Sequence, residues 1–273
     1  MSDTLLVRPM SGHAGAEIDN VDLSKPLCVE QKNGIRDALA RHGVVFFRKQ
    51  SITPAQHDRF ARLFGEPTDV KMVDTVPDFP HMSLVAKAEE QLDNIGGGWH
   101  ADQTFHDVPP WGTVLVAREL PAFGGDTLFS SMGAAYEALS EGLKKMLDGL
   151  RAVHDNSMIG KLLASKTGKP HIPRTAVHPV VVRNPLTGRK SLFVNRAYTT
   201  HFEGWSERDS EALLSYLFIH GQRPEFQCRF RWEPGSIAFW DNIQVWHYAA
   251  NDYHGQRRVM HRIAIKGTPL IAA

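Results

Sequence analysis

The sequence has 273 residues, 42% of them hydrophobic, so the chain can bury the core of a single domain spanning residues 1–273. Its 31 basic and 30 acidic residues give a formal net charge of +1, which excludes the strongly basic surface typical of proteins that bind nucleic acid or anionic membranes. We therefore expect a small-molecule partner, no nucleic acid and no membrane.

The cysteines and the N-terminus bear on the compartment. Cys28 and Cys228 are the only cysteines and lie far apart, so we expect neither a disulfide framework nor a thiolate metal site, and we expect both in the core. Residues 1–10 lack a basic stretch followed by a long apolar run, and no run of about 18 apolar residues occurs anywhere. A cytoplasmic protein is therefore expected.

The N-terminal third predicts a mixed α/β region. Apolar residues recur at helical spacing over Val29–His42 and over residues 53–64, and Val44–Phe47 between them is a short apolar run typical of a buried strand. Residues 67–98 have weak periodicity and end in three glycines. They predict a mobile loop that acts as an active-site lid.

Short β-branched and aromatic runs dominate from residue 112 onward. These candidate strands lie at residues 113–117, 177–182, 191–194, 227–232, 236–240 and 259–265. Helices are expected at residues 134–150 and 206–220, and the second begins with Ser206 and Asp209 in a capping-box-like spacing. This series predicts a mainly β barrel or sandwich with flanking helices.

A candidate metal site follows the three glycines, in Trp99-His100-Ala101-Asp102. Because side chains alternate along an extended segment, His100 and Asp102 would project to the same side. A third ligand must come from elsewhere, and His247, which follows an aromatic strand, is the leading candidate. Two histidines and one carboxylate on one face leave positions on iron for a bidentate oxoacid and O2.

Other readings of these histidines compete with a metal site. A His-x-Asp pattern occurs often by chance, and the chain has 14 histidines, most of which would lie on the surface or in the core. His106 is a rival third ligand. In a regular strand it would be about 13 Å from Asp102, so we exclude it on geometry.

The C-terminal strand places Arg258, Met260 and Arg262 on one face. The two arginines could face solvent on an edge strand or face a cavity, and alternation does not decide between these. In a cavity, each guanidinium could hold a different acid through paired charge-assisted hydrogen bonds. Thr127, in Gly124-Gly125-Asp126-Thr127, either offers a hydroxyl to an oxoacid carboxylate or belongs to a plain β-turn.

Together these segments resemble the taurine/aryloxyacetate (TauD/TfdA) family of Fe(II)/α-ketoglutarate-dependent dioxygenases, nearly end to end. The resemblance is carried by residues 99–105, 124–128, 240–242, His247 and 257–262, with residues 15–18, 21–23, 41–46 and 178–181 in addition. It implies a double-stranded β-helix (jelly roll) and iron ligands at His100, Asp102 and His247.

The same resemblance implies the roles of further residues. Thr127 and Arg258 would bind the two carboxylates of α-ketoglutarate (2-oxoglutarate), and Arg262 would anchor an anionic substrate. Gln103 and Tyr198 would line the substrate pocket. The reaction would consume O2, hydroxylate a small organic anion and release succinate and CO2, with C–S or C–O cleavage where the hydroxylated carbon bears sulfur or oxygen. The family also implies a homo-oligomer.

Taurine itself is not the expected substrate. Val70 and Val73 stand where taurine-specific members carry a His and a Tyr that reach the substrate, and a substrate-contacting Asn aligns near Gly96. A buried ammonium group would then lack partners. A sulfonate, an alkyl sulfate or an aryloxyalkanoate is expected instead.

Two functions of other classes could use the same residues. A zinc-dependent hydrolase could use the same ligands to activate water, but it would not need an arginine clamp for an oxoacid. A non-catalytic binding protein on the same barrel would not need a complete ligand triad.

Overall fold

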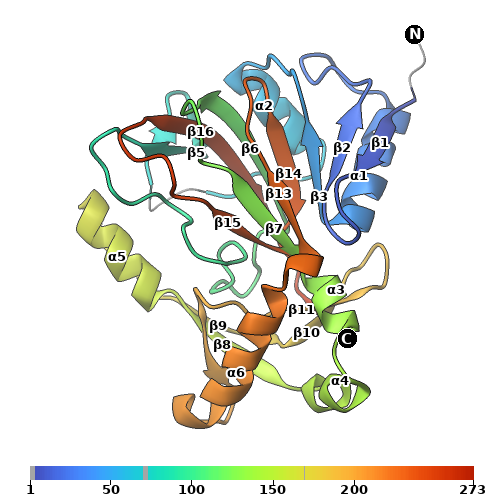
Figure 1. Ribbon diagram of the computed structural model, residues 1–273, viewed down its shortest axis with the longest axis vertical. Coiled ribbons are helices and arrows are strands. Elements are labelled where there is room, and N and C mark those ends of the chain that lie inside the picture. Colours follow the sequence, from blue (N-terminus) through green and yellow to red (C-terminus); the bar gives the residue numbers. More distant parts are fainter. Residues whose placement is uncertain (1–3, 70–72, 169) are drawn as a thin grey trace.

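The computed structural model describes residues 4–69, 73–168 and 170–273. Its largest layer is an eight-stranded sheet in the order β1-β2-β3-β14-β6-β16-β5-β4, in the upper part of Figure 1. Its strands are β1 (Leu6–Pro9), β2 (Ala16–Asp19), β3 (Val44–Phe47), β4 (Thr75–Val76), β5 (Phe79–Lys87), β6 (Gly112–Glu119), β14 (Ile237–Asp241) and β16 (Arg258–Ile265). Among the described strands, β2 and β3 are the one pair that runs in parallel.

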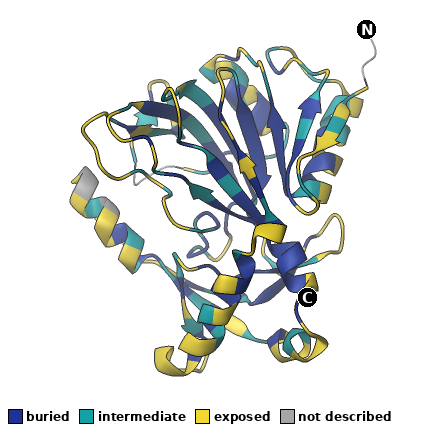
Figure 2. Ribbon diagram, viewed as in Figure 1, coloured by how far each residue is buried: buried dark blue, intermediate teal, exposed yellow. Residues whose placement is uncertain are grey.

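A second sheet, in the order β13-β7-β15, packs on one face of the first. Its strands are β7 (Thr127–Ser131), β13 (Gln227–Phe230) and β15 (Val245–Ala249). The core between the sheets includes the rings of Phe46 and Phe230, which stack with centroids 4.0 Å apart, and Figure 2 shows these central strands as mostly buried. Two facing, largely antiparallel sheets form the predicted jelly roll, so the expected fold class is confirmed.

Two helices cover the opposite face of the large sheet. They are α1 (Val29–His42) and α2 (Pro54–Arg62). Leu39 of α1 and Phe60 of α2 belong to the same buried cluster as Phe239 of β14. The central strands are therefore covered on both faces, which explains why their sequences are apolar at successive positions rather than alternating.

The lower region of Figure 1 contains two three-stranded sheets, β12-β8-β9 and β11-β10-β17. The strands are β8 (Arg151–Asp155), β9 (Thr175–Pro179), β10 (Val181–Arg183), β11 (Lys190–Leu192), β12 (Thr199–Phe202) and β17 (Ile271–Ala272), and the helices are α3 (Met132–Glu137), α4 (Glu141–Leu147), α5 (Ser157–Thr167), α6 (Glu207–Gly221) and the 3-10 helix η1 (Pro224–Phe226). Apolar residues of α3, α6 and β8 pack around Trp246 of β15. This region therefore supports the strand that carries His247.

Three expectations about local structure are wrong. Residues 79–87 form strand β5 rather than a loop. The sequence did not show this strand because the buried polar side chains of Ser83 and Lys87 interrupt its apolar alternation. The helix expected at 134–150 is two helices, since Ser140 caps the start of α4 through the backbone N–H of Leu143. Cys28 is exposed and caps α1, whereas Cys228 is buried as expected.

Within the described part of the chain, no helix is long and apolar enough to cross a membrane.

Candidate metal centre and active site

Three predicted ligand residues come together at one end of the jelly roll. The ligand atoms of His100, Asp102 and His247 all lie within 4.8 Å of one another. The backbones of the two histidines pair directly, with the N–H of His247 donating to the carbonyl of His100 at 2.8 Å and the reverse bond at 3.1 Å. Asp102 Oδ1 lies 3.8 Å from His100 Nε2 and 3.7 Å from His247 Nε2. The three side chains therefore converge on one point.

The segment that carries Asp102 is a turn rather than the extended strand that we expected. His100 makes an isolated β-bridge to His247, after which residues 101–106 turn, with φ of +51° at Gln103. The N–H of His106 donates to the carbonyl of Gln103 at 3.2 Å. The strand spacing that we used to exclude His106 does not apply, although the cluster of three does not include it.

One hydrogen bond orients the His100 imidazole, and burial favours the neutral form of His247. His100 Nδ1 lies 2.7 Å from the carbonyl oxygen of Gly98, which can only accept, so we infer that Nδ1 carries the proton and that Nε2 is free. Burial lowers the pKa of His247 well below its ordinary value, and nearby His100 lowers it further, while Asp102 raises it. Neutral imidazole is the form that binds a metal.

The carboxylate of Asp102 is held through one oxygen. Thr113 Oγ1 donates to Asp102 Oδ2 at 2.9 Å, and Arg262 Nη2 forms an ion pair with the same oxygen at 2.7 Å. Burial raises the pKa of the Asp102 carboxyl, but the positive charge of Arg262 and the neighbouring histidines lower it more, so it lies below its usual range. The carboxylate is therefore ionised and its Oδ1 faces the imidazoles.

Asn242 connects the ligand turn to the sheet. Its Oδ1 accepts from the indole N–H of Trp240 at 2.9 Å and from the backbone N–H of Asp102 at 3.3 Å, and its Nδ2 donates to Thr113 Oγ1 at 3.0 Å. Sequence reasoning missed the positioning roles of Asn242 and Thr113. The one available signal was the Trp240-Asp241-Asn242 segment, which was noted only for its resemblance.

The arginines of β16 face the space between the two sheets, which settles the alternative that the sequence left open. Met260, between them, is fully buried in the core shared by both sheets. Arg258 is 5% exposed, and its Nε and Nη2 find no hydrogen-bond partner among the described residues. Its guanidinium lies 5.7 Å from the ring centroid of Trp232, whose indole N–H donates to Thr127 Oγ1 at 2.9 Å. Thr127 and Arg258 thus lie near the same indole.

Two of the remaining predicted pocket residues lie near the ligand residues. Burial raises the pKa of Tyr198, and the nearby charge of Asp102 raises it further. Gln103 directly follows Asp102 in the turn. A Cβ on Gly96 would lie 3.5 Å from His100 Cε1, so any larger residue there would contact this imidazole. Val73 is half-buried, and Val70 lies outside the described residues.

A buried polar cluster holds the ligand turn at Thr104. Thr104 Oγ1 lies 2.9 Å from His154 Nδ1 and accepts from Asn195 Nδ2 at 3.1 Å. His178 Nε2 lies 2.8 Å from the carbonyl of Thr104, so the imidazole donates there. These side chains come from β8, β9 and the loop after β11, so three distant segments fix the turn next to Asp102.

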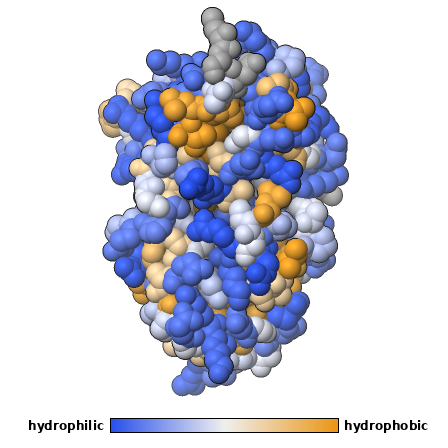
Figure 3. All heavy atoms as spheres, turned by 90° about the vertical axis from the view of Figure 1, so that its right-hand side faces the viewer, coloured by the Kyte–Doolittle hydropathy of each residue, from blue (hydrophilic) through white to orange (hydrophobic). Residues whose placement is uncertain are grey.

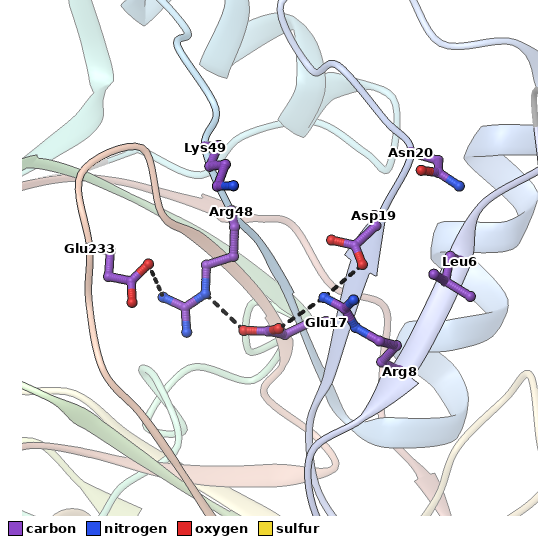
Figure 4. Close-up of a pocket in the computed structure, with 8 residues that line it drawn as sticks. All are labelled: Leu6, Arg8, Glu17, Asp19, Asn20, Arg48, Lys49 and Glu233. Carbon is purple, nitrogen blue, oxygen red and sulfur yellow. Dashed lines mark hydrogen bonds and ion pairs between the residues drawn. The ribbon is translucent and has the colours of Figure 1, made fainter. Parts of the chain in front are cut away.

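A separate depression lies at the edge formed by β1, β2 and β3 (Figure 4). Most of its charged side chains pair with one another: Arg8 is 2.7 Å from Asp19, and Arg48 is 2.8 Å from Glu17. Figure 3 shows the face on this side of the molecule as mostly hydrophilic with separate apolar patches. Because most of its charges are mutually neutralised, we assign no ligand to it.

Comparison with known proteins identifies the family. The model of the family described as "Taurine catabolism dioxygenase TauD, TfdA family" matches residues 6–264, nearly the whole chain. The chain belongs to this family. It is an Fe(II)- and 2-oxoglutarate-dependent dioxygenase that uses O2, and the resemblance seen in the sequence is confirmed.

Individual relatives cover almost the full length. An "Alpha-ketoglutarate-dependent sulfate ester dioxygenase" of Pseudomonas putida is 34% identical over 272 residues, or 96% of this chain and 89% of that protein. An "Alkylsulfatase" of Acinetobacter baylyi is 34% identical over 274 residues, or 96% and 85%. A crystal structure titled as a taurine dioxygenase from Burkholderia xenovorans has a TM-score of 0.85 and 36% identity, covering 98% of this chain and 91% of that one.

The buried cluster under the ligand turn predicts a pH dependence of stability. Burial lowers the pKa of His154 to about 3, whereas an unfolded histidine titrates near about 6.5. As the pH falls below about 6.5, His154 therefore takes up a proton in the unfolded state but not in the folded state. The free energy of unfolding then falls by about 1.4 kcal/mol per pH unit for this group. Between pH 7.5 and 5.5, the free energy of unfolding of His154→Asn should fall by about 1.4 kcal/mol less than that of the wild type. Urea unfolding at the two pH values measures this.

The exposed His254, changed in the same way to His254→Asn, is the matched control and should behave as the wild type does. Equal pH-dependent losses in His154→Asn and the wild type would show that His154 is not held neutral in the fold.

Proposed function

We propose that His100, Asp102 and His247 bind the catalytic Fe(II), that Arg258 and Thr127 bind 2-oxoglutarate, and that the substrate is a small organic anion. The observation that carries this is the buried Arg258 guanidinium, which has unsatisfied donors and lies between the same two sheets as the ligand cluster. Buried N–H donors of a cation that are left without an acceptor are costly unless a ligand supplies one.

The donor set fits a non-haem iron centre. Two neutral imidazole nitrogens and one carboxylate oxygen on one face are typical of Fe(II) oxygenases and leave positions for a chelating oxoacid and O2. The bound iron supplies the activation of O2 that oxidises 2-oxoglutarate to succinate and CO2 and hydroxylates the substrate. A hydrolase would not need a buried Arg258 with two unsatisfied nitrogens, and a binding protein would not need the ionised Asp102, whose Oδ2 is held by both Thr113 and Arg262.

The chain's own residues would bind and orient the oxoacid and would exclude water from the site. Arg258 can give two parallel hydrogen bonds to a carboxylate, and the Thr127 hydroxyl can give one more. The cluster is walled by Phe129 and Trp240, whose ring centroids lie 6.2 and 4.7 Å from that of His247. These apolar walls keep the site dry, which strengthens the electrostatic contacts within it.

We propose an alkyl sulfate as the first substrate to test, followed by sulfonates and aryloxyalkanoates. Arg262 would bind the anionic group, and Gln103 and Tyr198 would line the pocket. The two relatives at 34% identity are named for sulfate esters, and Gly96 leaves no polar side chain to meet an ammonium group. Hydroxylation of the carbon that bears the ester oxygen gives a hemiacetal sulfate, which collapses to an aldehyde and inorganic sulfate.

A substrate panel tests this assignment through succinate release. An alkyl sulfate should give the fastest substrate-dependent succinate release, with equimolar aldehyde and sulfate, and taurine should be poor because its ammonium would be buried without a partner. The alcohol of the same chain length is the matched control, since it lacks only the anion. Faster turnover of taurine, or equal turnover of the alcohol, would contradict the assignment.

The hold on Asp102 predicts an effect on metal affinity. Thr113→Val keeps the shape of the side chain but removes its hydrogen bond to Asp102 Oδ2, so Fe(II) affinity should fall about 10- to 100-fold, as is usual when a group that orients a ligand is lost. Anaerobic calorimetric titration with Fe(II) measures this. Thr200→Val, at an exposed threonine of β12, is the control; affinity in Thr113→Val equal to that of this control would show that the bond plays no part.

Several further expectations stay predictions. These are a single domain over residues 1–273, a lid formed by residues 67–98, a homo-oligomer and a cytoplasmic location.

A further inference from the structure

Lys87 is a buried lysine directly opposite Arg258. The two residues face each other in the antiparallel pair of β5 and β16, and Lys87 is only 2% exposed. Side chains at directly opposed positions lie on the same face of the sheet, and like charges placed there destabilise the pair. Lysine is also rarely buried to this degree without a partner. The fold therefore places two cations together where neither sheet stability nor solvation favours them.

No acidic residue in the described part of the chain forms an ion pair with either cation. Lys87 Nζ lies 3.5 Å from the carbonyl of Tyr253 and 4.3 Å from the centroid of its ring. The nearby acids are engaged elsewhere: Asp126 and Asp252 both pair with Arg229, at 2.7 and 3.5 Å. Within the protein, Arg258 has the side chain of Tyr253 as a hydrogen-bond partner and Asp126 as a nearby negative charge, while its Nε and Nη2 stay without a partner. The positive charge of Lys87 and Arg258 is therefore only partly offset by the described residues.

Lys87 and Arg258 both pack near the side chain of Tyr253. A Cβ on Gly125 would lie 3.2 Å from Arg258 Cδ and 3.3 Å from Tyr253 Cδ1, so Arg258 and Tyr253 both pack against this glycine. Lys87 in turn lies over the Tyr253 ring. The three side chains are thus in one contiguous group, which Arg258 connects to Trp232 and, through its indole N–H, to Thr127.

We infer that Lys87 supplies a second positive charge to the pocket that receives the distal carboxylate of 2-oxoglutarate, and so selects a dicarboxylic over a monocarboxylic oxoacid. This rests on the proposed role of Arg258. A distal carboxylate beside Arg258 offsets the repulsion between the two buried cations, and a monocarboxylic 2-oxoacid cannot. The two cations repel each other in the free protein, and the bound cosubstrate would offset this repulsion.

The experiment compares Lys87→Met with Lys145→Met, a control at an exposed lysine of α4. The KM for 2-oxoglutarate should rise about 10- to 100-fold in Lys87→Met, the range expected for one contact to a charged group, while the KM for the organic substrate stays the same. The preference in kcat/KM for 2-oxoglutarate over 2-oxobutyrate should fall by a similar factor. Lys87→Gln repeats the test if the methionine variant does not fold.

Thermal unfolding separates this role from a structural one. Without ligands, Lys87→Met should unfold at the same or a higher temperature than the wild type, because a like-charge pair is removed. Saturating succinate should raise the unfolding temperature of this variant by less than it raises that of the wild type. A change of less than threefold in the KM for 2-oxoglutarate, in either variant, would overturn the inference whatever the unfolding temperature. Arg258→Met is measured alongside: if it also leaves this KM unchanged, the proposed cosubstrate site itself fails.

Discussion

The candidate active site depends on how the Asp102 carboxylate is held. Thr113 and Arg262 both engage Oδ2, so Oδ1 faces the two imidazoles. This geometry needs three elements at once: β6 supplies Thr113, β16 supplies Arg262, and the backbone bridge between His100 and His247 brings the ligand turn to the sheet. The jelly roll makes these elements neighbours, and the buried cluster around Thr104 fixes the turn from the other side.

The balance of buried charge explains why the pocket should accept anions. Arg262 is paired with Asp102, whereas Arg258 and Lys87 have no ion-pair partner among the described residues. An unpaired buried cation is costly in the free protein, and this cost is recovered only when an anion binds. In the proposed function, the same two residues would provide the affinity for an oxoacid with two carboxylates.

The sequence was most informative where a local pattern carries the chemistry. The strand series predicted the fold, and the motif residues His100, Asp102 and His247 do converge, although a turn and not the expected strand spacing brings Asp102 there. The alternation of Arg258 and Arg262 placed both arginines on one face but could not say which way that face points. Lys87 and Thr113 were missed because their importance comes from register: nothing local says that β5 pairs with β16 or that β6 passes beside Asp102. The buried polar residues of β5 even hid the strand, since they break the pattern that would have revealed it.

The most direct test of the central claim is anaerobic mixing of the protein with Fe(II) and 2-oxoglutarate, followed by visible absorption. Chelation of iron by the oxoacid at His100, Asp102 and His247 should give a metal-to-ligand charge-transfer band, and this band should be absent in Asp102→Ala at the same protein concentration. A wild-type protein without the band, or with turnover that requires zinc and is indifferent to 2-oxoglutarate, would contradict the account.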